Sequence, residues 1–188
     1  MTLSDLHLQG KRALVRVDFN VPLDGAQNVT DDTRIRRAIP TIQALLDGGA
    51  SVVLMSHLGR PKGPSADLSL KHIVPTLSNL LGKAVKFAED CVGDKALDVT
   101  QSLQSGEVAL LENLRFHSEE KAGDEFFAGQ LAESGDVYVN DAFGTAHRAH
   151  ASTAVIAKFF PEDKAFGLLM QGEVEALHKV LSLSLIHI

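Results

Sequence analysis

Short apolar runs alternate along this chain with segments in which apolar residues recur at helical spacing. The first run covers residues 13–19, and the clearest helical segment follows it, with one apolar face formed by residues 35, 38, 39, 42, 45 and 46. The same alternation predicts further strands at residues 51–56, 84–87, 108–111 and 137–139, and further helices at residues 68–81, 94–103, 124–134 and 152–159. Because the strands are short apolar runs rather than strict alternations of apolar and polar residues, we expect both faces of the sheet to be buried. The pattern therefore predicts the α/β class: a doubly wound, mostly parallel sheet with helices on both faces, as in a Rossmann-like three-layer sandwich.

Two details of these helices can be tested against a structure. Pro40 lies inside the first helical segment and should kink it or separate its first turn. In the helix at residues 124–134, the side chains of Phe126, Phe127 and Leu131 are expected to point inward.

Composition and charge narrow the class of protein. The chain has 188 residues, of which 45% are hydrophobic and 22% charged, which is typical of one globular domain. A formal net charge of −6 argues against a general partner role with nucleic acid or an anionic membrane surface. A single cysteine excludes an internal disulfide, and we expect a cytoplasmic protein. The first ten residues lack a basic start and an apolar core, so no signal peptide is expected, and no apolar run has the length of a membrane span.

Polar residues follow the predicted strands at the edge where ligands bind in open α/β sheets, beyond the carboxyl ends of the strands. They are Asp18, Asn20, His57, Arg60, Glu112, Asn113, Arg115, Asn140, Asp141, His147, Arg148 and His150. Arg34 joins them at the start of the first helix. Four arginines at one edge of an acidic protein indicate an anion site, because guanidinium forks match carboxylate and phosphate groups. The expected ligand is a small phosphorylated or carboxylated anion.

Other kinds of site have little support in the sequence. No G-x-G-x-x-G follows a strand, so a dinucleotide site is not indicated, and the Gly82-Lys83 pair lacks the remainder of a phosphate-binding loop. We expect Cys91 to be a structural or incidental thiol rather than a nucleophile, because the topology places no base near it. No Cys/His cluster has zinc spacing, and Asp31 and Asp32 are explained by helix capping rather than by a metal.

Four motifs in order carry a resemblance to a known family. They are RVDFNVP at residues 16–22, SHLGRPKG at 56–63, LENLRFH at 111–117 and NDAFGTAHRAH at 140–150. Together they closely resemble the N-terminal domain of the phosphoglycerate kinases. The resemblance implies a phosphoglycerate-binding domain at residues 1–170 and the start of an interdomain helix at 171–181, with a tail at 182–188 that does not match the family.

The resemblance also implies an activity and a set of site residues. Phosphoglycerate kinases transfer a phosphoryl group reversibly from 1,3-bisphosphoglycerate to ADP, giving 3-phosphoglycerate and ATP, as monomeric, cytoplasmic enzymes of glycolysis. By motif match, Asp18 and Asn20 would hold the hydroxyl and carboxylate end of the glycerate, and Arg34 would be catalytic, lying against the phosphoryl group in transfer. The remaining substrate-binding residues would be Phe19, His57, Leu58, Gly59, Arg60, Arg115 and Arg148, with His57, Arg60, Arg115 and Arg148 gripping the phosphate that is not transferred.

The nucleotide side of such an enzyme is not expected in these residues. The family's glycine-rich loop and lysines for the nucleotide are absent from the sequence, so Mg²⁺ with ATP or ADP would be bound by a C-terminal domain, and this polypeptide alone should be inactive. A second hypothesis stays open, because a fold does not fix a function. The chain could be a non-catalytic module that binds a phosphorylated anion on the same fold.

Overall fold

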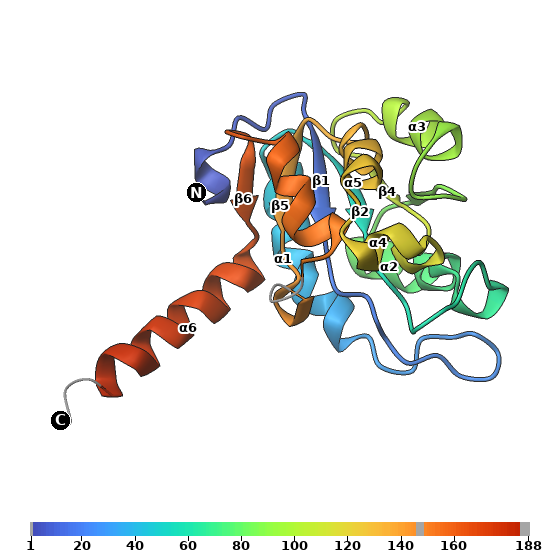
Figure 1. The fold of residues 1–188 in the computed structure, drawn as a ribbon, viewed down its shortest axis with the longest axis horizontal. Helices are drawn as coiled ribbons and strands as arrows, with labels where there is room; N and C mark the ends of the chain where they lie inside the picture. Colours follow the sequence, from blue (N-terminus) through green and yellow to red (C-terminus); the bar gives the residue numbers. More distant parts are fainter. Residues whose placement is uncertain (1, 146–148, 185–188) are drawn as a thin grey trace.

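The protein, described here by a computed structural model covering residues 2–145 and 149–184, is built on a six-stranded parallel sheet. The strands lie in the order β3-β4-β2-β1-β5-β6 (Figure 1). Their bounds are β1 Arg12–Arg16, β2 Ser51–Met55, β3 Val85–Phe87, β4 Val108–Leu110, β5 Val137–Asn140 and β6 Lys164–Phe166. The expected strands are found close to their predicted positions, whereas β6 was not expected.

Helices join the strands and cover both faces of the sheet (Figure 1). The α-helices are α1 Thr33–Asp47, α2 Val74–Leu81, α3 Asp94–Gln101, α4 Ser118–Ala122, α5 Glu125–Ala132 and α6 Leu168–Ser184. Short 3₁₀ turns are η1 Leu3–Asp5, η2 Ala66–Leu68, η3 Leu70–Ile73, η4 Leu114–Phe116, η5 Phe143–Thr145 and η7 Ile156–Phe159, and η6 Ala151–Val155 is a π-helical turn. Of the helices formed by residues 2–145 and 149–184, none combines the length and the apolar character needed to cross a membrane.

Two hydrophobic cores lie on opposite faces of the sheet, because successive side chains of a strand point to opposite sides. In β1, Ala13 and Val15 pack with α1 and α2, whereas Leu14 packs with α3, α5 and the turns at residues 151–159. The doubly wound, three-layer architecture expected from the apolar strands is therefore confirmed.

Pro40 does not separate the first turn from the rest of the helix, because α1 runs as one helix from Thr33 to Asp47. Its buried face, including Ile35 and Ile42, lies on both sides of the proline and is held against the sheet. Pro40 has no N–H to donate to the Arg36 carbonyl four residues earlier. The proline ring is exposed, so water can reach that carbonyl instead. Tertiary packing thus offsets the lost intrahelical hydrogen bond.

The prediction that Phe126 points inward is wrong, since its side chain is 77% exposed. The buried residues of α5 are Phe127, Ala128 and Leu131. At about 100° per residue these three share one side of the helix, and Phe126 falls on the opposite side. The prediction treated two adjacent aromatic residues as equivalent, which the helical period does not allow.

Two predicted helices differ from the structure in length or type. The helix expected at residues 68–81 is divided into η2, η3 and α2, and Pro75 occupies the first turn of α2. The segment at residues 152–159 forms the turns η6 and η7 instead of an α-helix. At the C-terminal side, α6 continues from Leu168 to Ser184 without a break, extending away from the sheet in Figure 1. The domain boundaries at residues 170 and 181 stay predictions.

Candidate functional site

A polar cavity of about 290 Å³ lies at the carboxyl edge of the central strands. Its lining residues come from the segments that follow β1, β2, β4 and β5: Asp18, Asn20, Arg34, His57, Gly59, Arg60, Arg115 and Gly144. After β1 the chain adds β2, β3 and β4 on one side and then crosses over to add β5 and β6 on the other, so the sheet has its topological switch point beside β1. This is the edge at which open α/β sheets bind their ligands.

The segment after β1 forms one wall of the cavity. Asp18 pairs with Arg34 at 2.5 Å between Oδ2 and Nη1, and its Oδ1 accepts the N–H of Asn20 at 3.2 Å. Asn20 Oδ1 in turn accepts the N–H of Gly59 at 2.8 Å, which joins this wall to the segment after β2. Arg34 remains 51% exposed and also lines a neighbouring cavity of about 230 Å³ with Asp141. The Arg34 guanidinium is therefore oriented by Asp18 while still reaching solvent.

A buried asparagine shapes the opposite wall. The Asn113 side-chain amide donates to the carbonyls of Leu58 and Leu68 at 2.8 and 2.9 Å, and its oxygen accepts the N–H groups of Leu58 and Arg115 at 3.2 and 3.1 Å. Arg115 Nη1 donates to the Gly59 carbonyl at 2.7 Å. Gly59 has φ +64°, and a Cβ there would lie 2.9 Å from Leu68, so the loop needs glycine at this point. The segments that carry His57, Arg60 and Arg115 are thus held as one unit.

His57 is a neutral side chain in this site. Burial, followed by the charges of Arg16 and Arg115, lowers the pKa of its imidazole to about 2. Arg16 Nη2 lies 3.1 Å from His57 Nδ1, and a guanidinium can only donate, so Nδ1 is the acceptor. The ring hydrogen is therefore on Nε2, and His57 offers the cavity a hydrogen bond donor rather than a positive charge.

The depressed pKa of His57 predicts a pH dependence of stability. Above about pH 6.5 the imidazole is neutral in both the folded and the unfolded chain and contributes nothing. Below that value the His57 imidazole binds a proton in the unfolded chain but stays neutral in the folded chain. The free energy of unfolding should therefore fall by up to about 1.4 kcal/mol for each unit by which the pH is lowered. Urea unfolding at several pH values checks this, with His57→Asn as the comparison because it keeps an acceptor for Arg16. Equal acid slopes in the two proteins would show that His57 is protonated in the folded state.

Arg16 and its partners form a buried network behind the cavity that the sequence interpretation did not assign to the site. The Arg16 side chain is fully buried, and its Nε donates to Ser152 Oγ at 2.9 Å. Ser152 Oγ donates to Glu120 Oε1 at 2.5 Å, and Glu120 Oε2 accepts the Ser152 N–H at 3.0 Å. A positive and a negative side chain are thus bridged by one hydroxyl group. The available signal was an arginine at the end of an apolar strand, which requires a buried partner.

Several residues expected at the site do not line the cavity. The side chains of Phe19 and Leu58 are in the hydrophobic core, so in this structure only their backbones lie beside the cavity residues. Phe19 N–H donates to Ser56 Oγ at 2.9 Å, which fixes the start of the loop after β1. Arg148, expected to grip a phosphate, and His147 lie outside the described residues.

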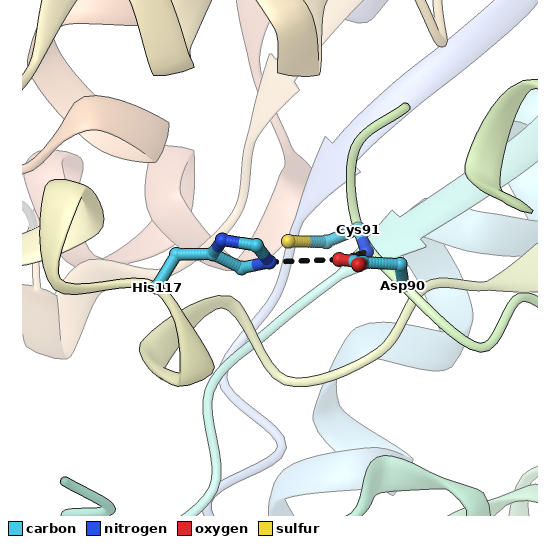
Figure 2. Close-up of side chains that lie close together, drawn as sticks. All are labelled: Asp90, Cys91 and His117. Atoms are coloured by element: carbon cyan, nitrogen blue, oxygen red, sulfur yellow. Dashed lines mark hydrogen bonds and ion pairs between the residues drawn. The ribbon is translucent and has the colours of Figure 1, made fainter. Parts of the chain in front are cut away.

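The prediction that no base lies near Cys91 is wrong. The His117 ring is close to the Cys91 sulfur and is hydrogen-bonded to Asp90 at 2.8 Å (Figure 2). The loop after β3 and the segment after η4 meet there because β3 and β4 are neighbours in the sheet. Burial, followed by the charge of Asp90, raises the pKa of the Cys91 thiol well above its usual value, which does not suit a nucleophile.

Comparison with known proteins gives consistent matches. A family model described as phosphoglycerate kinase matches residues 3–184. Among curated relatives, the phosphoglycerate kinase of Moorella thermoacetica is 57% identical over 183 residues, covering 97% of this chain and 46% of the relative. That of Porphyromonas gingivalis is 49% identical over 205 residues, covering 96% of this chain and 49% of the relative. The chain thus spans about half the length of the curated relatives it matches.

Solved structures agree with these matches. The crystal structure of phosphoglycerate kinase from Pyrococcus horikoshii superposes with a TM-score of 0.86 at 36% identity, covering 95% of this chain and 45% of that one. The structure of the phosphoglycerate kinase from Coxiella burnetii gives 0.84 at 37% identity, covering 95% and 44%. With the sheet order, the carboxyl-edge cavity and the match over residues 3–184, these findings establish that the chain belongs to the phosphoglycerate kinase family.

Proposed function

We propose that this chain supplies the phosphoglycerate-binding side of a phosphoglycerate kinase. The reaction is the reversible transfer of a phosphoryl group from the acyl phosphate of 1,3-bisphosphoglycerate to ADP, a step of glycolysis carried out by a cytoplasmic monomer. The observation that carries the proposal is the cavity at the carboxyl edge of the sheet, where three arginines, Arg34, Arg60 and Arg115, surround a space of about 290 Å³. A site with this charge, in a chain of net charge −6, is suited to a small, highly anionic ligand.

The two walls of the cavity suggest how the ligand lies. Arg60 and Arg115, with the Nε2–H of His57, would hold the phosphate that is not transferred, together with Arg148. Asp18 and Asn20, on the other wall, would bind the hydroxyl and carboxylate end of the glycerate. The backbones of Phe19, Leu58 and Gly59 would complete the substrate contacts.

Arg34 has a different place from the phosphate grip and would be the catalytic residue. It lies at the first turn of α1, pairs with Asp18 and faces both neighbouring cavities. Phosphoryl transfer requires alignment and charge neutralisation more than covalent help from the protein. A guanidinium fixed beside the phosphoryl group provides both, and closure of the enzyme around the substrate would exclude the water that hydrolyses an acyl phosphate.

The described residues do not fit Mg²⁺ with a nucleotide. Mg²⁺ takes oxygen ligands, whereas the one group of metal-ligating side chains found among residues 2–145 and 149–184 contains a thiol and an imidazole. The basic lining of the cavity also repels a divalent cation. Use of Mg²⁺ and ATP or ADP is implied by the family, and we propose that a C-terminal domain of the enzyme binds them.

Replacing Arg115 tests the proposed phosphate position. Arg115→Ala should weaken binding of 3-phosphoglycerate to this chain by about 1.5–3 kcal/mol, the scale of a hydrogen bond to a charged group. Binding by the unchanged chain should also weaken as salt is added, because the attraction is mainly electrostatic. Isothermal titration calorimetry measures both effects, and Arg36→Ala serves as a control because Arg36 is 62% exposed and outside the cavity. An unchanged dissociation constant in Arg115→Ala would place the phosphate elsewhere.

A chimera separates the enzyme from the alternative, a module that only binds a phosphorylated anion. In the chimera, residues 3–184 replace the matching segment of the Moorella thermoacetica relative, and phosphoryl transfer is followed in a coupled assay. Turnover that is lost on replacing Arg34 supports the proposal. Binding of 3-phosphoglycerate by this chain, without turnover in a folded chimera, favours the binding module.

A further inference from the structure

A second cluster of chemically versatile side chains lies away from the anion cavity. Asp90 and Cys91 belong to the loop after β3, and His117 follows η4 (Figure 2). One ligand atom from each of the three lies within 4.8 Å of the others. No residue of this cluster lines the anion cavity, so the function proposed above does not use it.

The fold holds these groups in place before any ligand arrives. Asp90 Oδ1 accepts His117 Nε2 at 2.8 Å and the backbone N–H of Cys91 at 2.7 Å, so the carboxylate is fixed against both neighbours. The His117 ring packs against Phe127 with ring centroids 5.2 Å apart. The Cys91 side chain is buried in the hydrophobic core on the face of the sheet that α3 and α5 cover. Because these side chains are already ordered, they lose little conformational entropy when a ligand binds.

The donor atoms determine which ligand fits. Thiolate, imidazole and carboxylate are the ligands of Zn²⁺, whereas Mg²⁺ and Ca²⁺ take oxygen atoms. With metal–ligand bonds of about 2.0–2.3 Å, donor atoms around a tetrahedral zinc ion lie about 3.3–3.6 Å apart. The present spacing, from 2.8 Å for the hydrogen bond to at most 4.8 Å, reaches that range with side-chain shifts on the order of 1 Å.

An adjacent cavity provides access and a fourth position. Asp90 and His117 are 37% and 31% exposed and line a cavity of about 540 Å³ that shares no residue with the anion cavity. Glu89 and Glu112 line the same cavity together with Lys71, and because the carboxylates, Asp90 included, outnumber the one lysine, the cavity favours a cation. Water in this space can complete a site with three protein ligands.

We propose that Asp90, Cys91 and His117 bind Zn²⁺, with water from the adjacent cavity as the fourth ligand. The Cys91 thiol releases its proton to solvent on binding, and its thiolate becomes a ligand. His117 gives up the hydrogen bond from Nε2 to Asp90, carries its hydrogen on Nδ1, and coordinates through Nε2. The site is independent of phosphoglycerate binding, so failure of the proposed function would leave it standing.

Titration of the full chain with Co²⁺ and Zn²⁺ tests the site. Co²⁺ should produce the absorption band of thiolate-to-metal charge transfer at one equivalent, and Zn²⁺ should remove the band by displacement. Calorimetry should show that His117→Gln weakens Zn²⁺ binding at least about tenfold, and Cys91→Ser should also abolish the Co²⁺ band. His72→Gln is the matched control, because His72 lines the same cavity outside the cluster and should leave the affinity within about twofold.

Each result decides the proposal. A Co²⁺ complex of the unchanged chain without the charge-transfer band would show that Cys91 is not a ligand, and equal Zn²⁺ affinity in His117→Gln would show that His117 is not one. Circular dichroism without metal confirms that the variants are folded. His117 is partly exposed, so its replacement should preserve the fold, and it decides the question even if Cys91→Ser disrupts the core.

Discussion

Replacing Glu120 with glutamine is expected to lower the free energy of unfolding by about 3–5 kcal/mol, the cost of leaving a buried charge without the opposite charge that balances it. Glu120 is 1% exposed, and the Arg16 guanidinium that it balances is fully buried. Glutamine keeps the shape of the side chain but removes the negative charge. In Glu120 the two carboxylate oxygens accept the N–H and the hydroxyl of Ser152. In glutamine an NH₂ group replaces one of these oxygens, so one of the two Ser152 donors would face another donor. Arg16 is left as a buried charge whose hydrogen-bond partners, Ser152, the Val17 carbonyl and His57, are all neutral.

Glu119 provides a matched control for this change. It is the preceding residue of α4, it is exposed, and Glu119→Gln makes the same chemical replacement. Urea unfolding followed by circular dichroism should therefore show a large loss for Glu120→Gln and a change within about 0.5 kcal/mol for Glu119→Gln. Similar small changes in both variants would mean that Ser152, the carbonyl of Val17 and His57 satisfy Arg16 without Glu120.

The fold could be predicted from the sequence because its strands are unambiguous. The middle of β1, Ala13 to Val15, and the residues of β2 after Ser51 are apolar. Helix α1 presents a buried stripe between polar ends, so period and length agree on the type of each element. The prediction was less accurate where local preference competes with packing. The first turn of α1 stays joined to the rest of the helix at Pro40 because the buried face spans the proline. Residues 151–159 form a wider π turn followed by a tighter 3₁₀ turn instead of an α-helix.

The residues around the anion cavity could be predicted for a topological reason. In a parallel sheet the carboxyl ends of all strands are at one edge, so Asp18, His57 and Arg115 had to approach one another. Their detailed contacts could not be predicted, because these depend on side chains from distant segments. Ser152 and Glu120 complete the partners of Arg16 only when the chain after β5 folds back over α4. The same holds for His117 and Cys91, whose separation in sequence hides their proximity.

Replacing Arg34 with alanine in the chimera described above should lower the turnover number at least about 100-fold, because a cis-supplied arginine in phosphoryl transfer is worth about 10³-fold or more in rate. The Michaelis constant for 3-phosphoglycerate should change much less. Arg34 is half exposed at the rim of the cavity, whereas Arg115 is anchored deeper by the Gly59 carbonyl. An interaction that strengthens as the phosphoryl group moves raises turnover rather than affinity.

Two further variants distinguish catalysis from a general effect of charge. Arg36→Ala removes an arginine from the same helix turn, but its guanidinium pairs with Asp32 outside both cavities, so turnover should stay near normal. Arg34→Lys keeps the charge without the planar fork and should restore only part of the rate. Arg148→Ala should show the opposite pattern to Arg34→Ala, with the Michaelis constant affected most. Steady-state kinetics on these variants measure each effect. Near-normal turnover in Arg34→Ala would show that Arg34 is not catalytic and that the cavity is only a binding site. The ion pair between Arg34 and Asp18 would then serve to orient the loop after β1.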